Sequence, residues 1–218
     1  PILVGGTGLF IDSFIDHIQF AHVQTNPDLR RELLAKDGTE LYRTLQQVDP
    51  TAAAEIHPNN KNRVVRALEL YYAGVTKTAQ NAASRREDSP YEALYFVLRY
   101  RDRQVLYDRI NTRVDAMLAA GLVEEARQAY AACGPTARQA IGHKELLPYL
   151  EGSEPLETAV ERLKQETRRY AKRQITWFKR RQGTVALEPD TMDTERLIAA
   201  ATAQAEDFLY GKDKGKRA

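Results

Sequence analysis

The 218-residue sequence predicts an α/β fold that is mostly helical and carries an inserted all-helical segment. First, a short apolar run at residues 2–4 leads through the glycine-rich residues 5–8 into a helix-like stretch, which is the order strand, turn, helix. Second, residues 21–90 contain helix-start patterns but no convincing strand. Third, aromatic and β-branched residues typical of a buried strand return at 91–100.

These patterns divide the chain into four parts. Residues 1–20 and 91–210 are predicted to form the α/β core, residues 21–90 the helical insertion, and residues 211–218 a disordered tail. Because the chain opens directly on an apolar run with no lead-in and no initiator Met, we expect its true N-terminus to lie upstream of residue 1. The core within this chain is therefore expected to be incomplete.

Three helices are expected in the insertion. One begins at Pro27 and another at Asp49-Pro50, because proline is favoured in the first helical turn. The third runs from Asn62 to Ala73 and is closed by Gly74. The polar run from Ala83 to Pro90 is expected to be the linker back to the core.

The part after the insertion is predicted to contain two strands and several helices. The strands are expected within Tyr91–Tyr100 and at Thr184–Leu187. Apolar residues at helical spacing or helix boundary residues predict helices over 102–120, 122–131, 155–181 and 194–209, a short helical stretch at 140–150 and a loop at 134–136.

Charge is distributed unevenly along the chain, although the net charge is only +2. The segment from Arg162 to Arg181 contains nine Lys or Arg and a single acid, Glu166, so it carries +8 while the rest of the chain carries −6. An even sprinkling of surface charge would not produce this asymmetry. A polyanionic partner such as a nucleic acid is therefore expected.

Other features argue against several classes of protein. No stretch is long and apolar enough to predict a membrane-spanning helix. The single cysteine, Cys133, has no partner for an internal disulfide or a Cys-based metal site, and the four histidines share no ligand-like spacing. Nothing suggests a Ser-His-Asp triad, a paired-carboxylate site or a zinc site. The expected setting is the reducing cytoplasm.

Two arginines are candidates for binding phosphate or diphosphate. Arg109 and Arg113 lie four residues apart, on the side of a predicted helix that faces away from the core. A guanidinium presents a planar fork of donors that suits anionic oxygens. The alternative is that both arginines are ordinary surface residues paired with Asp108 and Asp115.

Two further segments admit a functional and a structural interpretation. The turn Gly5–Gly8 would let the backbone approach a ligand, and the Thr7 hydroxyl would cap the next helix or bond a substrate. It is equally a tight strand–helix connection, and no Lys follows it as in a Walker A loop. Arg63 and Arg66 are predicted to lie on the same face of a helix. Two interpretations are open: this face contacts phosphate, or it is an ordinary solvated surface.

The basic segment contains aromatic residues, as nucleic-acid surfaces often do. Residues 172–179 read KRQITWFK, in which cations would supply affinity and rings would stack on bases. Trp177 fits either a stacking role or a place in the core, because an aromatic residue at helical spacing is often buried.

Six motifs, in their order and spacing, closely resemble one known family: PILVGGTGL, HPNNKNRVVRALEL, DRINTRVDAML, ARQAIGHKEL, YLEG and TRRYAKRQITWFKRR. The family is that of the tRNA dimethylallyltransferases, also called tRNA isopentenyltransferases, and the resemblance runs from Pro1 to about Arg181. It implies a P-loop NTPase-like core with a helical insertion. It also implies transfer of a dimethylallyl group from dimethylallyl diphosphate to N6 of the adenosine 3′ of the tRNA anticodon, with Mg²⁺ assisting, by a monomer.

The resemblance also implies roles for individual residues. Arg113 matches the arginine that holds the diphosphate, and Arg109 joins it by its place on the same helix face. Thr7 matches a threonine near the reacting base, so Arg113 and Thr7 are the catalytic candidates. The implied contacts with the tRNA anticodon stem-loop are Thr7, Arg30, Asn62, Arg63, Val64, Val65, Arg66, Gln139, Ala140, Ile141, Gly142, His143, Lys144, Lys172, Arg173, Gln174, Ile175, Thr176, Trp177, Phe178 and Lys179.

The sequence departs from the family pattern in three ways. Phe10 and His143 each stand where the family usually has tyrosine. The Walker-type loop and the general-base aspartate of the family have no counterpart in this chain and are expected upstream. The resemblance therefore assigns no metal ligand or base here, and the 218 residues alone are expected to be inactive.

Two alternatives remain open. An adenylate dimethylallyltransferase would act on a free nucleotide and would need neither a long insertion nor a basic stripe. A non-catalytic RNA-binding fragment would keep the stripe without the chemistry.

Overall fold

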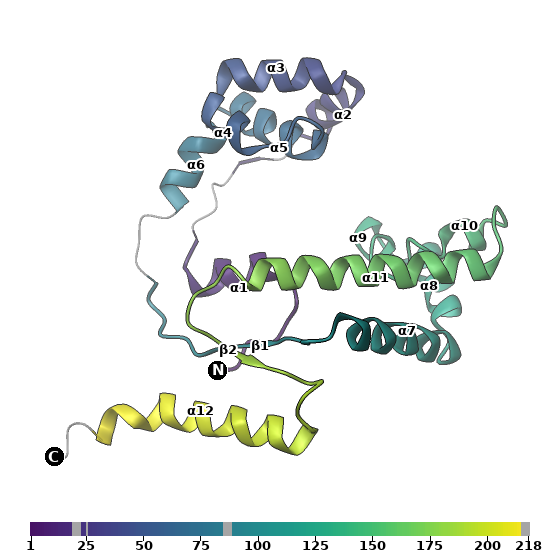
Figure 1. The fold of residues 1–218 in the computed structure, drawn as a ribbon. Coiled ribbons are helices and arrows are strands. Elements are labelled where there is room, and N and C mark those ends of the chain that lie inside the picture. Colours follow the sequence, from purple (N-terminus) through teal and green to yellow (C-terminus); the bar gives the residue numbers. More distant parts are fainter. Residues whose placement is uncertain (19–22, 25, 85–88, 215–218) are drawn as a thin grey trace. The chain divides into compact units, whose positions relative to one another are not determined.

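A computed structural model of the chain describes residues 1–18, 23–24, 26–84 and 89–214 (Figure 1). It separates into two compact units, Pro1–Ala93 and Leu94–Ala218. The boundary lies close to the predicted end of the insertion. That residues 1–20 belong to one core with residues 91–210 stays a prediction.

The start of the first unit differs from the prediction. Residues 2–4 form no strand, and the side chains of Ile2 and Val4 are 93% and 88% exposed. A strand requires ladder hydrogen bonds to a neighbouring strand, and no described residue pairs with this segment. The helix expected after the glycine turn is present as α1 (Gly8–Ile15).

The rest of the first unit is helical, as the sequence predicts. Its helices are α2 (Pro27–Ala35), α3 (Gly38–Val48), α4 (Pro50–Glu55), α5 (Lys61–Tyr72) and α6 (Lys77–Ser84). The sequence prediction missed α3 and α6. A capping-box pattern at Asp37 to Glu40 marks the start of α3 and could have revealed it. Residues 85–88 of the predicted linker lie outside the described residues.

Side-chain caps explain where these helices begin. Asn26 Oδ1 accepts hydrogen bonds from the backbone N–H groups of Asp28 and Leu29, at 3.1 and 3.0 Å. Asp37 accepts from the N–H groups of Thr39 and Glu40 in the same way. Each cap satisfies donors that have no partner inside the helix, which is typically worth about 1 kcal/mol.

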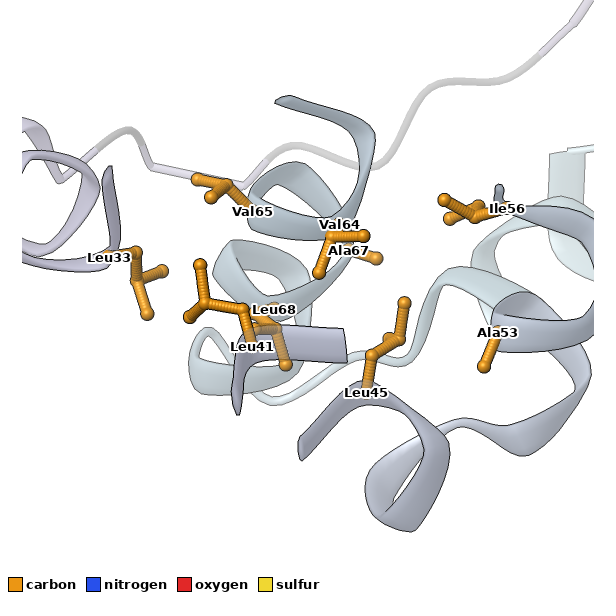
Figure 2. Packing of buried hydrophobic residues seen from close by; sticks show 9 residues of the cluster. All are labelled: Leu33, Leu41, Leu45, Ala53, Ile56, Val64, Val65, Ala67 and Leu68. Carbon is orange, nitrogen blue, oxygen red and sulfur yellow. The ribbon is translucent and has the colours of Figure 1, made fainter. Parts of the chain in front are cut away.

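Apolar side chains from α2, α3, α4 and α5 meet in one core (Figure 2). The buried members are Leu33, Leu41, Leu45, Ala53, Ile56, Val64, Val65, Ala67 and Leu68. They recur at helical spacing along α3 and α5, so each helix presents one face to the core. The opposite face of α5 is left for charged residues.

A buried carboxylate fixes α4 to α6. Asp49 is 4% exposed, and its Oδ1 accepts from the Ala52 N–H at 3.1 Å and from Thr78 Oγ1 at 2.5 Å. Its Oδ2 accepts from the Thr78 N–H at 3.0 Å. Burial alone would raise the pKa of Asp49, but these hydrogen bonds outweigh it, so the pKa lies below its ordinary value.

We expect Asp49→Asn to lower the free energy of unfolding by about 1–3 kcal/mol at neutral pH, because the amide cannot accept all three bonds. A lowered folded-state pKa stabilises the fold above the ordinary aspartate pKa of about 4, and this contribution is lost as pH falls through the folded-state value. The substitution should therefore also reduce the acid sensitivity of unfolding. Urea unfolding at neutral and acidic pH measures both effects. Asp28→Asn, at an exposed position, is the control, and equal stability of the two variants at neutral pH would contradict the prediction.

The second unit contains a small parallel sheet. Strand β1 (Tyr95–Leu98) pairs with β2 (Thr184–Leu187), with Tyr95 opposite Thr184 and Leu98 opposite Leu187. Both strands were predicted, although β1 is shorter than the expected range. The described residues thus form a mostly helical α/β structure.

Helices make up the rest of the second unit. They are α7 (Arg103–Ala119), α8 (Leu122–Ala132), α9 (Pro135–Arg138), α10 (Leu147–Leu150), α11 (Leu156–Phe178) and α12 (Thr194–Lys214). Buried residues of α7, α8 and α11, among them Val114, Ala126 and Leu163, form a second core with Leu146. The predictions of α7, α8 and α11 are confirmed.

Three boundaries in this unit correct the predictions. A short helix, α9, replaces the expected loop at 134–136, since proline is well suited to a first helical turn. Within 140–150 only α10 is helical. Helix α12 continues to Lys214, because one glycine costs a helix only about 1 kcal/mol, and residues 215–218 of the predicted tail lie outside the described residues.

Candidate functional site

Thr7 is exposed at the N-terminal end of α1. Its carbonyl oxygen accepts from the N–H groups of Phe10 and Ile11, at 3.0 and 3.3 Å. The hydroxyl does not cap α1. Of the two roles predicted for this hydroxyl, capping is therefore excluded, and contact with a substrate stays a prediction.

Helix α5 carries both core residues and exposed cations within the predicted tRNA-contacting stretch. Val64 and Val65 are 1% and 0% exposed, so their side chains belong to the core, and a contact of these two residues with tRNA stays a prediction. They lie on the inner face of α5, whereas Arg63 and Arg66 lie outside. Asn62 is also exposed and lines an open pocket with residues 57 and 59–61.

Two predicted tRNA-contacting arginines share one carboxylate. Arg30 Nη1 lies 3.0 Å from both oxygens of Glu69, and Arg66 Nη1 lies 3.3 Å from Glu69 Oε2. Arg63 has no acidic partner among the described residues. This outer face of α2 and α5 therefore presents more positive than negative charge.

The alternative for Arg109 and Arg113, pairing with nearby acids, is wrong. Asp108 accepts from Gln104 Nε2 at 2.8 Å, and Asp115 pairs with Lys164 Nζ at 2.7 Å. Both arginines are exposed on α7, and no acid of the described ranges pairs with either of them. Two guanidiniums with unused donors remain available to an anion.

Polar contacts between α7 and α11 show which side of α7 carries Arg109 and Arg113. Arg168 Nη1 donates to Asn111 Oδ1 at 2.7 Å, and Lys164 pairs with Asp115. Asn111 and Asp115 thus face α11. Arg109 and Arg113 lie on the opposite side of α7 by helical geometry.

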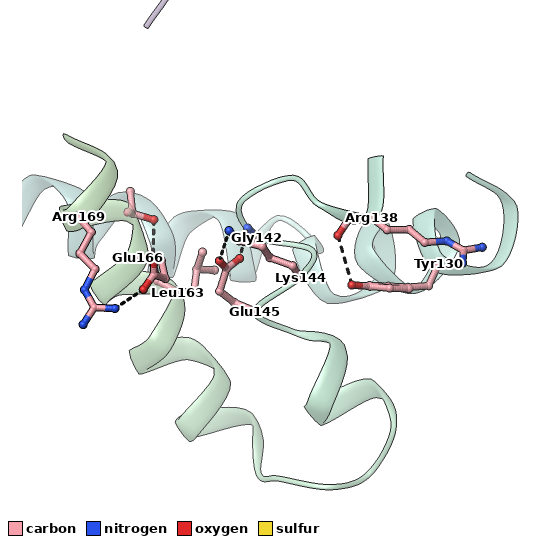
Figure 3. A network of polar contacts seen from close by, with 9 residues as sticks. Tyr130, Arg138, Gly142, Lys144, Glu145, Leu163, Glu166 and Arg169 are labelled. Carbon is pink, nitrogen blue, oxygen red and sulfur yellow. Dashed lines mark hydrogen bonds and ion pairs between the residues drawn. The ribbon is translucent and has the colours of Figure 1, made fainter. Parts of the chain in front are cut away.

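The stretch 139–144 is held by polar contacts, one of which uses the buried carboxylate of Glu145 (Figure 3). Gly142 adopts a positive φ of 105°, and its N–H donates to Glu145 Oε2 at 2.9 Å. His143 is held by the carbonyl of Ala137 at 2.9 Å and by Glu125 Oε1 at 3.1 Å.

The residues of this predicted RNA-contacting stretch differ in how far they are exposed, and their contact with tRNA stays a prediction. Gly142 is buried, whereas Gln139, Ala140 and Lys144 are exposed and Ile141 is half-buried. Glu145, which holds the turn, was missed because nothing in a single sequence marks an acid as buried.

Cations in the first part of α11 are occupied by structural contacts. Arg162 pairs with Glu154 and Arg169 with Glu166, while Lys164 and Arg168 contact α7. Three of these four cations are balanced by a carboxylate, whereas Arg168 bonds the neutral amide of Asn111 and keeps its charge in a half-buried position.

Several cations in the last part of α11 and just after it, unlike most of those in its first part, are not paired with acids in the described residues. Lys172, Arg173, Lys179 and Arg180 are exposed, and the described residues provide no acidic partner for any of them. The Cζ atom of Arg173 lies over the ring of Tyr170, 5.6 Å from the ring centroid.

Trp177 is 37% exposed, which places it at the surface rather than in the core. Exposed cations beside an exposed ring suit an RNA surface.

Side chains that could bind a metal ion do not cluster in the described part of the chain. Residues 1–18, 23–24, 26–84 and 89–214 contain no group of three or more His, Cys, Asp or Glu that could hold a metal ion. Binding of Mg²⁺ together with a diphosphate therefore stays a prediction. Among the helices of the same ranges, none has the length and apolar character of a transmembrane segment.

The chain is similar to named proteins of one kind. A tRNA dimethylallyltransferase of Exiguobacterium sibiricum is 49% identical over 185 residues, covering 82% of this chain and 57% of that protein. One from Halalkalibacterium halodurans is 40% identical over 221 residues, covering 97% of this chain and 68% of the relative. The chain thus spans less than two thirds of the length of several curated relatives that it matches.

Solved structures similar to the chain are also named as transferases or allyltransferases that act on tRNA. A tRNA isopentenylpyrophosphate transferase from Bacillus halodurans matches the whole chain with a TM-score of 0.63 and 36% identity, over 69% of its own length. A eukaryotic dimethylallyltransferase acting on tRNA matches 97% of the chain with a TM-score of 0.71 and 29% identity, over 57% of its length. The family model described as IPP transferase matches residues 1–181. The chain therefore belongs to the IPP transferase family.

Proposed function

We propose that the protein transfers a dimethylallyl group from dimethylallyl diphosphate to N6 of the adenosine 3′ of the anticodon in tRNA. The observation that carries the proposal is that exposed cations on α7 and at the end of α11 lack acidic partners in the described part of the chain. Relatives named for this activity support it. The proposal includes a P-loop NTPase-like core, a Mg²⁺ ion that accompanies the diphosphate, a monomeric state and a cytoplasmic location.

The proposed reaction forms a bond between N6 of adenine and an allylic carbon and breaks the bond from that carbon to the diphosphate oxygen. The exocyclic amine is a poor nucleophile, so cleavage of the carbon–oxygen bond leads and negative charge grows on the leaving oxygens. Arg113, with Arg109 beside it, would stabilise that charge through fixed guanidinium donors. The proton lost from N6 passes to a base that we assign to no residue of this chain.

On the RNA side, the adenosine must leave its stack to reach the allylic carbon. Thr7 would contact RNA near the reacting base. The exposed cations of α11 would bind the phosphate backbone, and Trp177 would provide a surface for base stacking. A broad basic surface of this kind is expected for a folded RNA substrate and not for a free nucleotide.

An acceptor competition tests the proposal. The complete protein is incubated with labelled dimethylallyl diphosphate and equal concentrations of tRNA and AMP, and label is followed into each acceptor. We expect label in tRNA at the adenosine 3′ of the anticodon. Preferential labelling of AMP would replace the proposal with an adenylate dimethylallyltransferase. Binding of tRNA without transfer would leave only an RNA-binding module.

A further inference from the structure

Glu69 on α5 is the only acid in the described residues that pairs with two of the predicted RNA-contacting arginines. It lies 3.0 Å from Arg30 Nη1 on α2 and 3.3 Å from Arg66 Nη1 one helical turn away. Its side chain is only 10% exposed, whereas those of Arg30 and Arg66 are 45% and 46% exposed. The carboxylate therefore lies beneath two guanidiniums that reach the surface.

The backbone around Glu69 is held firmly in place. Its neighbours Leu68 and Leu70 are 0% and 2% exposed. Helix α2 is tied to α5 at a second point, where Lys61 Nζ donates to the carbonyl oxygens of Leu34 and Lys36 at 2.7 and 2.6 Å. Because contacts fix both helices, the two guanidiniums are presented from a rigid surface.

The charge and donor balance of this trio suits a phosphate group. Two guanidiniums carry +2 against one carboxylate, so the trio keeps a net charge of +1. Each guanidinium has five N–H donors, and the structure uses only those of one Nη1 atom of each arginine. The remaining donors of two adjacent planar forks match the oxygens of a phosphate.

We propose that Glu69 is a positioning residue, which holds Arg30 and Arg66 side by side as a binding site for one phosphate of the RNA backbone. The inference rests on the proposed function, because it takes tRNA as the ligand. Holding two long side chains in their binding geometry before RNA arrives reduces the conformational entropy lost on binding.

If Glu69 positions the two arginines, removing its charge should weaken tRNA binding, whereas simple electrostatics would strengthen it. Removing an acid from a protein ordinarily strengthens its binding to a polyanion, because a repulsive charge disappears. Glu69→Gln removes such a charge but also releases both arginines. We expect it to raise the Kd for tRNA about fivefold and to lower the salt slope of binding by about one, which corresponds to one lost phosphate contact.

The matched control is Glu32→Gln on α2, which removes the same charge from an exposed acid paired with Lys36. We expect its Kd for tRNA to be unchanged or lower than that of the wild type. Tighter binding by Glu69→Gln, or equal behaviour of the two variants, would overturn the proposal. Both variants are measured in the complete protein across a salt titration.

A double-mutant background separates positioning from a merely structural role. In a protein that already carries Arg30→Ala and Arg66→Ala, Glu69→Gln should no longer raise the Kd, because no guanidinium remains to be held. A fivefold loss that persists in this background would show that Glu69 acts through the fold and would overturn the proposal. If wild-type protein fails to bind tRNA, the proposed function itself fails. If it binds and Glu69→Gln has no effect, only the present inference fails.

Discussion

Replacing Arg113 with alanine is expected to lower the rate of dimethylallyl transfer by roughly two to three orders of magnitude. Arg113 is exposed on α7, and the described residues leave its guanidinium without an acidic partner. In the proposed reaction its donors meet charge that grows only as the diphosphate leaves, so the loss falls on the transition state. Single-turnover rates with saturating tRNA, in the complete protein, measure this effect.

Two variants on the same helix serve as controls. Arg103→Ala removes an equal charge from another exposed position of α7 and should change the rate less than threefold. Arg113→Lys should fall between wild type and alanine, because it keeps the charge but loses the planar fork. A loss below about threefold for Arg113→Ala would remove this residue from the diphosphate site. Unfolding stability should hardly change, since Arg113 lies outside the core.

The second large effect is expected at the end of α11. The double substitution Lys172→Ala and Arg173→Ala should weaken tRNA binding about ten- to hundredfold near physiological salt and lower the salt slope by about one to two. The reason is that both side chains are exposed and no acid of the described ranges neutralises them. Binding titrations at several salt concentrations give both quantities.

The other half of the same helix provides a matched control. Lys164→Ala with Arg168→Ala removes the same charge, but these residues bind Asp115 and Asn111 on α7. This pair should lower the free energy of unfolding and leave the salt slope nearly unchanged. An equal change of slope in both double variants would show that the division of α11 into a structural and an RNA-binding half is wrong.

Much of the fold was predictable because local rules and tertiary packing agree. Helices α7 and α11 combine apolar residues at helical spacing with clear boundary residues, and β2 matches its predicted range. Helices α3 and α6 were missed although α3 carries local signals, a capping-box pattern at its start and the buried leucines Leu41 and Leu45 one turn apart. The strand expected at residues 2–4 was wrong because a strand depends on a partner that no local pattern specifies.

The site was predictable as a set of segments but not residue by residue. The motif containing Val64 and Arg66 was identified as one stretch, yet neighbouring positions of the same helix face either the core or the solvent. Spacing also could not decide whether Asp115 binds Arg113, because its actual partner, Lys164, comes from another helix. Long-range pairing of this kind requires the tertiary structure.

The contacts between α7 and α11 have a consequence for how relatives diverge. Lys164 with Asp115, and Arg168 with Asn111, each join two helices through groups that match in charge or hydrogen bonding. A change at one member leaves the other without its partner, so substitutions at the two positions should be inherited together. Covariation between positions 115 and 164 is therefore expected among homologous sequences, whereas Lys172 and Arg173 should vary with the RNA and not with α7.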